Sequence, residues 1–218
     1  MKPTAKMPEE WRLRPEERNG WPKTLTAAEL LGLELPPIRW SVQGLVPEGV
    51  TLLAGKPKVG KSWMAFGIAI AISTGGVALG TRQVEMGDVL YMALEDNYRR
   101  LKKRLEKLLT GETPERLQIV TEWPRMDEGG AEALERWLEA HPDARAVVVD
   151  ILKRVRPRTS PNRSIYEADY EALEAMQRLA GEHEVSIVVV HHLRKQGAAD
   201  PLDEISGSTG LSGGLMVC

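Results

Sequence analysis

One short segment of the chain combines glycine, lysine and serine at the spacing of a phosphate-binding loop. It fits G-x-x-x-x-G-K-[ST] and reads Gly55-Lys56-Pro57-Lys58-Val59-Gly60-Lys61-Ser62, followed by Trp63. The glycines permit backbone conformations that aim successive amide N–H groups at phosphate oxygens. Lys61 would contact the β- and γ-phosphates, and the Ser62 hydroxyl would ligate Mg²⁺. We therefore predict that this segment, the P-loop, binds ATP with Mg²⁺, and that Trp63 adjoins the nucleotide.

A magnesium-nucleotide site also needs a carboxylate at the end of a buried strand. The run Ala146–Val149 is apolar and is followed by Asp150. An ordinary strand that ends in a turn residue has the same pattern. Beside a P-loop, however, we interpret Asp150 as the Walker B aspartate, which makes Ser62 and Asp150 the predicted metal ligands.

Hydrolysis of a triphosphate requires a group that orients and activates water. Glu95 follows the apolar run Val89–Leu94 and would lie at the same sheet edge as the P-loop. Asp96, its neighbour, is an alternative. Asp96 or Asn97 would also serve as the N-cap of a helix that begins at Tyr98. We predict Glu95 as the catalytic base and a neighbouring residue as the cap.

Two adjacent histidines end the last apolar run. Because side chains alternate along a strand, His192 shares its side with Val188 and Val190. His191 takes the opposite side, so only one histidine can reach the nucleotide. A metal site is the rival interpretation, but adjacent histidines on a strand diverge and no clear third ligand is offered.

These residues need a scaffold, and the hydrophobic pattern predicts an α/β fold with a mostly parallel central sheet flanked by helices. The expected strands are Val50–Ala54, Val89–Leu94, Leu117–Thr121, Ala146–Asp150 and Val185–His191. The expected helices are Lys61–Ile72, Tyr98–Leu109, Ala131–Ala140 and Ile165–Ala180. Right-handed crossovers would place all the strand carboxyl ends at one edge, where open α/β sheets bind ligands.

Composition places limits on partners and location. The 218 residues carry 29 Lys and Arg against 31 Asp and Glu, so no global positive field attracts nucleic acid. The single cysteine is Cys218, and the N-terminus has no apolar signal region, which indicates a cytoplasmic protein. Trp63–Gly80 carries no charge, but glycine and hydroxyl residues interrupt it, so we interpret it as a buried helix rather than a membrane span.

The proline-rich, charged residues 1–24 are expected to form a flexible tail, and residues 25–218 the ATPase domain. Thr26 and Glu29 have capping-box spacing and predict a short helix before Pro36 and Pro37. The core of the domain should begin near Arg39.

Several further segments carry a family resemblance. They are Arg39-Trp40-Ser41-Val42, Leu45-Val46-Pro47-Glu48-Gly49, the P-loop, Ala93-Leu94-Glu95-Asp96-Asn97, Val149-Asp150, His191-His192-Leu193-Arg194-Lys195 and Gly207-Ser208-Thr209-Gly210. With them the chain resembles, over residues 26–214, the RecA-like AAA family ATPases related to RepA-type hexameric replicative helicases of plasmids and phages. The resemblance implies a RecA-like P-loop NTPase in which Glu95 is the base, Asp150 supports Mg²⁺ and His192 senses the γ-phosphate.

The resemblance also implies a hexameric ring with an arginine finger supplied by the neighbouring subunit. Relatives continue beyond the Gly-Ser-Thr segment with further core strands and basic residues, whereas this sequence stops at Cys218. We therefore expect the last strands and the arginine finger to be missing.

Two loops are candidates for binding single-stranded DNA. Residues 153–163 contain five cations and no acidic residue, and residues 194–212 begin with two cations and are rich in small residues. Either could equally be a solvated surface loop. The basic residues of Tyr98–Leu109 are expected to form a solvated helix face with no ligand.

Three functions remain open at this point. The first is an ATP-driven helicase or translocase in the replication of a plasmid, phage or other mobile element. The second is an ATP-gated DNA-binding or regulatory ATPase, and the third is an inactive truncated fragment. No acceptor-site signature of a metabolic kinase is present.

Overall fold

The computed structural model describes residues 26–109, 111–161 and 163–192, and it divides into two units at the boundary between Ile38 and Arg39. The tail predicted for residues 1–24 and the loop predicted for residues 194–212 lie outside the described residues. Each unit is considered by itself.

Among its described residues, the first unit contains one short helix, α1 (Ala27–Leu31), which forms where the sequence predicted a capping box. The Glu29 backbone N–H donates to Thr26 Oγ1 at 3.2 Å, and the Thr26 N–H donates to Glu29 Oε2 at 2.8 Å. These reciprocal bonds satisfy amide groups that an isolated first turn would leave without acceptors. All five residues of α1 are exposed. The sequence therefore specifies this helix through its local capping bonds and not through burial.

The second unit is built on a sheet of five parallel strands, in the order β3-β9-β8-β6-β7. Their bounds are β3 (Gly49–Gly55), β6 (Asp88–Ala93), β7 (Leu117–Val120), β8 (Ala144–Asp150) and β9 (Ser186–His192). Each of the five predicted strands is present, with ends displaced by no more than two residues. The P-loop strand β3 and the Asp150 strand β8 are separated by β9.

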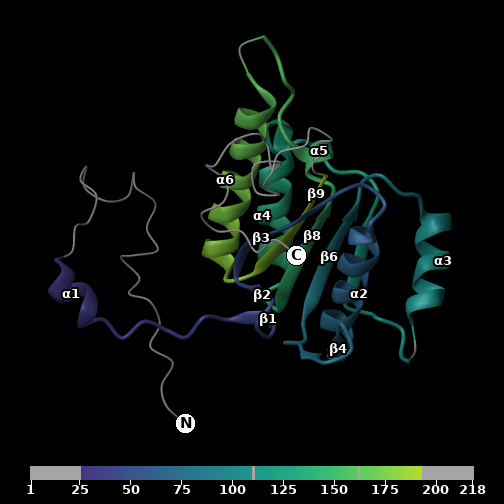
Figure 1. The fold of residues 1–218 in the computed structure, drawn as a ribbon, viewed down its shortest axis with the longest axis horizontal. Helices are drawn as coiled ribbons and strands as arrows, with labels where there is room; N and C mark the ends of the chain where they lie inside the picture. Colours follow the sequence, from purple (N-terminus) through teal and green to yellow (C-terminus); the bar gives the residue numbers. More distant parts are fainter. Residues whose placement is uncertain (1–25, 110, 162, 193–218) are drawn as a thin grey trace. The chain divides into compact units, whose positions relative to one another are not determined.

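Helices cover both faces of this sheet (Figure 1), with α2 and α3 on one side and α4 and α6 on the other. Their bounds are α2 (Lys61–Thr74), α3 (Tyr98–Leu108), α4 (Ala131–Ala140), α5 (Leu152–Val155) and α6 (Ile165–His183), with a π-helical turn η3 (Met126–Gly130) before α4. Val148 packs in the cluster under α2, whereas Val147 and Val149 pack in the opposite cluster. Because β8 is buried on both faces, its sequence is a continuous apolar run.

The uncharged stretch from Trp63 is a core helix, as the sequence analysis concluded. The helix α2 ends at Thr74, where Gly75 adopts a left-handed φ of 69°, and Phe66 and Ile72 are fully buried against the sheet. In the part of the chain that the structure describes, no helix combines the length and apolar character that crossing a bilayer requires.

Two small hairpins were not predicted. They are formed by β1 (Trp40–Val42) with β2 (Val46–Pro47), and by β4 (Val77–Ala78) with β5 (Arg82–Gln83). Ser41 Oγ donates to the Arg145 carbonyl oxygen at 2.8 Å and lies 2.7 Å from Ser186 Oγ. The first hairpin therefore fixes the amino ends of β8 and β9, at the opposite end of the sheet from the P-loop.

The register of the strands decides which residues meet at the carboxyl edge. Gly55 pairs with His192 across β3 and β9, and Asp150 pairs with Val190 across β8 and β9. Asp150 also pairs with Ala93, and its carbonyl oxygen accepts from Leu94 N at 2.7 Å. The sheet thereby brings all the predicted site segments to one edge.

A tight approach at the start of β6 gives a test of this packing. A Cβ at Gly87 would lie 2.3 Å from Arg145 Cγ and 2.4 Å from the Asp143 carbonyl oxygen. Gly87→Ala is therefore expected to lower the free energy of unfolding, measured by urea denaturation, by about 1–3 kcal/mol. Gly181→Ala is the matched control, because a Cβ there meets nothing within 4 Å on α6. The control should be neutral or stabilising, and equal loss in both variants would contradict this packing.

Candidate functional site

The P-loop connects β3 to α2 through backbone conformations that few residues adopt. Gly60 has φ of 97° and is the N-cap of α2, and Lys58 has φ of 67°. A side chain at Gly60 would be strained at that φ, which explains the glycine. Within the described residues, no side chain caps the amino end of α2. Its first amide groups and the positive end of its dipole thus face the loop, where an anion would be stabilised.

Lys61 spans the loop from its first helical position. Its Nζ donates to the Gly55 carbonyl oxygen at 2.6 Å and to the Lys56 carbonyl oxygen at 2.8 Å. Burial lowers the pKa of Lys61, and the nearby Asp150 carboxylate opposes that shift. The lysine predicted to bind phosphate thus donates to the loop's own carbonyl groups.

Asp150 is the point at which the P-loop helix and the sheet meet. Its Oδ1 accepts from Ser62 Oγ at 3.0 Å, and its Oδ2 accepts from the Tyr91 hydroxyl at 2.9 Å. Burial raises the pKa of Asp150, and the hydrogen bonds from Ser62 and Tyr91 oppose that shift. Both carboxylate oxygens thus have fixed hydrogen-bond donors in a buried position.

The oxygen atoms of Ser62 and Asp150 fit a magnesium ion. A hydroxyl and a carboxylate are hard oxygen ligands, and the hydrogen bond of 3.0 Å already brings them together. Among the residues that the structure describes, no three His, Cys, Asp or Glu gather in a group that could hold a metal unaided. A cation here would take its remaining ligands from phosphate oxygens and water, as Mg²⁺ does in nucleotide sites.

The structure separates the roles of the three polar residues after β6. Asn97 is the N-cap of α3, since its Oδ1 accepts from Arg100 N at 3.0 Å. Asp96 is 9% exposed and is held by Arg100 at 2.6 Å and Arg104 at 2.7 Å. Glu95 is 43% exposed at the sheet edge. Of the two carboxylates, Glu95 is the one that remains open to solvent.

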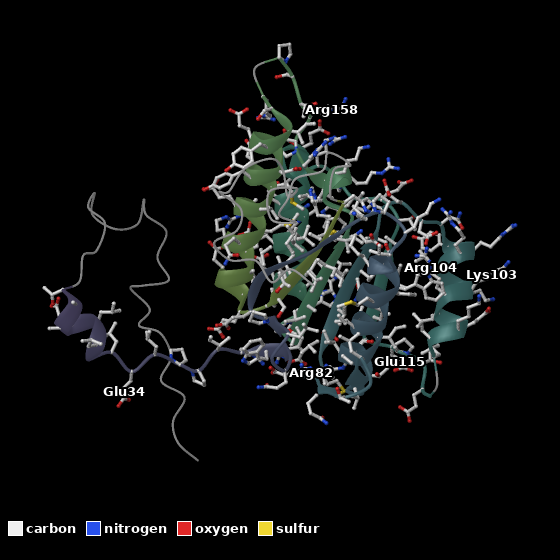
Figure 2. All side chains as sticks on the ribbon, viewed as in Figure 1. Glu34, Arg82, Lys103, Arg104, Glu115 and Arg158 are labelled. Carbon is white, nitrogen blue, oxygen red and sulfur yellow. The ribbon has the colours of Figure 1, made fainter. Side chains whose placement is uncertain are left out.

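One part of α3 differs from the solvated face expected from sequence. The Arg104 guanidinium lies over the Trp63 ring, 5.3 Å from the ring centroid, on the side of α3 nearest α2 (Figure 2). Together with its bond to Asp96, this contact joins α3 to the residue that follows the P-loop. The expectation of a wholly solvated basic helix is therefore wrong for Arg104, because its guanidinium has both an aromatic ring and a carboxylate as partners.

The two histidines at the end of β9 diverge, as strand alternation predicted. His192 pairs with Gly55 at the start of the P-loop and shares its strand face with Val190, which packs under α2, whereas His191 shares the opposite face with Val189. Burial lowers the pKa of both imidazoles and favours their neutral forms. A cavity of about 240 Å³ lies on the α5 and α6 side of the pair, so it is not the space in front of the P-loop.

The basic segment 153–163 begins with the helical turn α5, and its arginines are paired with carboxylates from elsewhere in the fold. The pairs are Arg154–Glu95 at 3.5 Å, Arg156–Asp169 at 2.9 Å, Arg158–Glu128 at 3.2 Å and Arg163–Asp127 at 3.1 Å. Arg158 projects from the segment between α5 and α6 (Figure 2). The segment therefore carries less free positive charge than its sequence indicates.

Tyr91 is the site residue that sequence reasoning missed. It lies in the apolar run of β6 and is fully buried, with its ring 4.8 Å from that of Phe66. The available signal was its hydroxyl, because a buried tyrosine hydroxyl needs a hydrogen-bond partner. The partner could not be identified without knowing that β6 and β8 are neighbours.

The buried carboxylate makes stability depend on pH. Because burial raises the pKa of Asp150, the folded chain holds this proton more tightly than the unfolded chain. The stabilisation that comes from protonating Asp150 is fully present below the pKa of this group in the unfolded chain. It is lost as pH rises through the pKa of the group in the folded chain. Asp150→Asn should therefore raise the free energy of unfolding at neutral pH by about 1–2 kcal/mol. Urea unfolding in chelator should show this gain shrinking towards about pH 4, and a gain independent of pH would contradict it.

A second variant isolates the tyrosine hydroxyl. Tyr91→Phe keeps the ring against Phe66 but removes the donor to Asp150, so it is expected to cost about 1–3 kcal/mol of stability at neutral pH. The same change in an Asp150→Asn background should cost less, because the acceptor there is uncharged. Urea unfolding of the four chains measures this coupling, and identical costs in both backgrounds would show that the charge of Asp150 does not strengthen the bond.

Comparisons with known proteins agree with this architecture. The AAA domain family matches residues 15–198, whereas no curated protein matches the chain. Among solved structures, the chain is similar to a DnaB-like replicative helicase described with its interactions with primase, at 17% identity and a TM-score of 0.53. That match covers 70% of this chain and 40% of the helicase chain. The predicted RecA-like α/β fold is confirmed, and the chain belongs to the AAA domain family.

Proposed function

We propose that this chain binds ATP with Mg²⁺ and hydrolyses it, and that the reaction drives movement along or unwinding of DNA in the replication of a mobile element. The observation that carries the proposal is the hydrogen bond of 3.0 Å between Ser62 and Asp150. It joins the P-loop helix to the carboxyl end of β8, which is the arrangement a magnesium-nucleotide site requires. Family membership and the likeness to a replicative helicase support the replication context.

In this mechanism, the P-loop amide groups and the amino end of α2 bind the phosphates. Lys61 exchanges the carbonyl oxygens of Gly55 and Lys56 for β- and γ-phosphate oxygens. Ser62 and Asp150 hold Mg²⁺, which supplies charge neutralisation for the phosphoryl group. Tyr91 keeps its hydrogen bond to Asp150 Oδ2, which leaves Oδ1 directed at the P-loop.

The remaining residues act on the water and the γ-phosphate. Glu95 orients the attacking water and accepts its proton as the water oxygen bonds to phosphorus and ADP departs. The open position of Glu95 and the sequestered position of Asp96 support this assignment. His192 has the role of contacting the γ-phosphate and responding to its loss in this proposal, and its pairing with Gly55 across β3 and β9 supports that assignment.

The nucleic acid in this proposal is single-stranded DNA, bound through residues 153–163 and 194–212. A homohexameric ring is part of the same proposal. The chain spans 40% of the length of the helicase that it resembles, so the activity of a whole helicase is assigned here only as a proposal.

A second function is favoured by one observation. Four arginines of the segment 153–163 are paired with carboxylates of this same chain. These ion pairs would keep the arginines from DNA until nucleotide binding rearranges the site. Such a segment suits an ATP-gated DNA-binding protein that unwinds nothing. Such a protein would bind DNA in a nucleotide-dependent manner with little stimulation of turnover.

Turnover measurements distinguish these functions. Magnesium-dependent ATP hydrolysis should rise on addition of single-stranded DNA and fall about 10²-fold or more in Lys61→Ala and Glu95→Gln. Glu95→Gln should still bind a fluorescent ATP analogue, whereas Lys61→Ala should bind it weakly.

Lys107→Ala on the outer face of α3 serves as the control and should behave as the unaltered chain. Binding that requires Lys61 but gives no DNA-stimulated turnover would favour the gated DNA-binding protein. Full activity in Lys61→Ala would contradict both functions.

A further inference from the structure

The strongest unexplained contact at the site is the ion pair between Glu95 and Arg154. The Nε atom of Arg154 lies 3.5 Å from Oε1 of Glu95, and the side chains are 57% and 43% exposed. Within the described residues, this is the one ion pair that Glu95 makes. The predicted catalytic base is therefore held by a cation from the segment that we assign to DNA binding.

The position of Arg154 is set by the packing of its neighbours. Leu152 and Val155 of α5 are buried in the core, and Arg156 is anchored to the buried Asp169 at 2.9 Å. The short turn that carries Arg154 is thus fixed on both sides. The adjacency of β6 and β8 then places Glu95, which follows β6, beside the residues that follow Asp150.

The exposure of the pair makes it easy to exchange. Ion pairs between solvated side chains are weak, whereas a guanidinium binds a phosphate through charge-assisted and often bidentate hydrogen bonds. A DNA phosphate that reaches Arg154 therefore competes directly with Glu95. The two interactions of Arg154 exclude each other and are therefore linked. The factor by which the Glu95 pair weakens DNA affinity equals the factor by which bound DNA weakens the Glu95 pair.

We propose that Arg154 is a positioning residue that holds Glu95 away from the attacking water until a phosphate of single-stranded DNA takes its guanidinium. This inference rests on the proposed function and adds to it the residue through which DNA would stimulate hydrolysis. The bond that changes is the Arg154–Glu95 ion pair alone, and no group is transferred.

The first test needs no turnover. Affinity for a fluorescent poly-dT oligonucleotide is measured without nucleotide, at about 50 mM salt so that surface charges are little screened. Glu95→Gln should free Arg154 and tighten DNA binding by roughly two- to fivefold. In an Arg154→Ala background the same Glu95→Gln change should have no effect, whereas a general effect of removing negative charge would persist.

A matched pair on the same segment provides the comparison. Arg158 is paired with Glu128 at 3.2 Å, away from the site. Glu128→Gln should also tighten DNA binding, but that gain should survive Arg154→Ala and vanish in Arg158→Ala. This pattern would show that each carboxylate acts through its own arginine.

The second test measures turnover in the full chain. Arg154→Ala should raise DNA-free ATP hydrolysis by roughly two- to fivefold and abolish its further stimulation by saturating DNA, and Arg154→Lys should restore part of that stimulation. Arg178→Ala, which removes a surface arginine paired with Glu182 on α6, should leave both rates unchanged.

The outcomes separate this inference from the proposed function. An unaltered chain that binds no single-stranded DNA would refute the proposed function and this inference with it. An unaltered chain that binds DNA, with a Glu95→Gln effect that persists without Arg154, would overturn the inference alone. Unchanged DNA-free turnover in Arg154→Ala, with stimulation retained, would do the same.

Discussion

The geometry of the candidate site is organised around a carboxylate that is kept out of water. Asp150 is 7% exposed, and its two oxygens accept from Ser62 and Tyr91, which belong to different elements. A buried charge is tolerated only when hydrogen bonds satisfy it, so α2, β6 and β8 must keep their relative positions to within a fraction of an ångström. That requirement explains the tyrosine in an otherwise apolar strand. It also explains why the first turn of the P-loop helix contacts the end of β8 through Ser62.

At this sheet edge, the residues with a proposed role in hydrolysis differ from the neighbouring residues that hold helices in place. Asp96 and Asn97 follow Glu95 directly. Asp96 forms ion pairs with two arginines of α3, and Asn97 caps that helix. Alternation along β9 similarly directs His192 to the P-loop side and His191 to the α6 side. Adjacent polar residues thus acquire separate roles, because a strand end presents successive side chains in different directions.

Features that sequence could predict are those with a local cause. The strands around Ala146–Asp150 and Val89–Leu94 are continuous apolar runs, and Thr26 with Glu29 is a local capping pattern. The hairpins β1–β2 and β4–β5 and the turn α5 are too short to produce a period. The contacts Tyr91–Asp150 and Arg154–Glu95 depend on the order of strands in the sheet, which the hydrophobic pattern does not specify.

The self-bonded state of Lys61 has a consequence for selectivity. Any anion that enters the P-loop competes with two backbone carbonyl oxygens for one ammonium group. In the proposed site, a ligand with linked phosphates would offer Lys61 acceptor oxygens on two phosphoryl groups, whereas an orthophosphate would offer them on one. If the loop binds phosphates as proposed, the competition with its own carbonyl groups would favour ligands that carry several linked phosphates, before any contact with the base or the sugar.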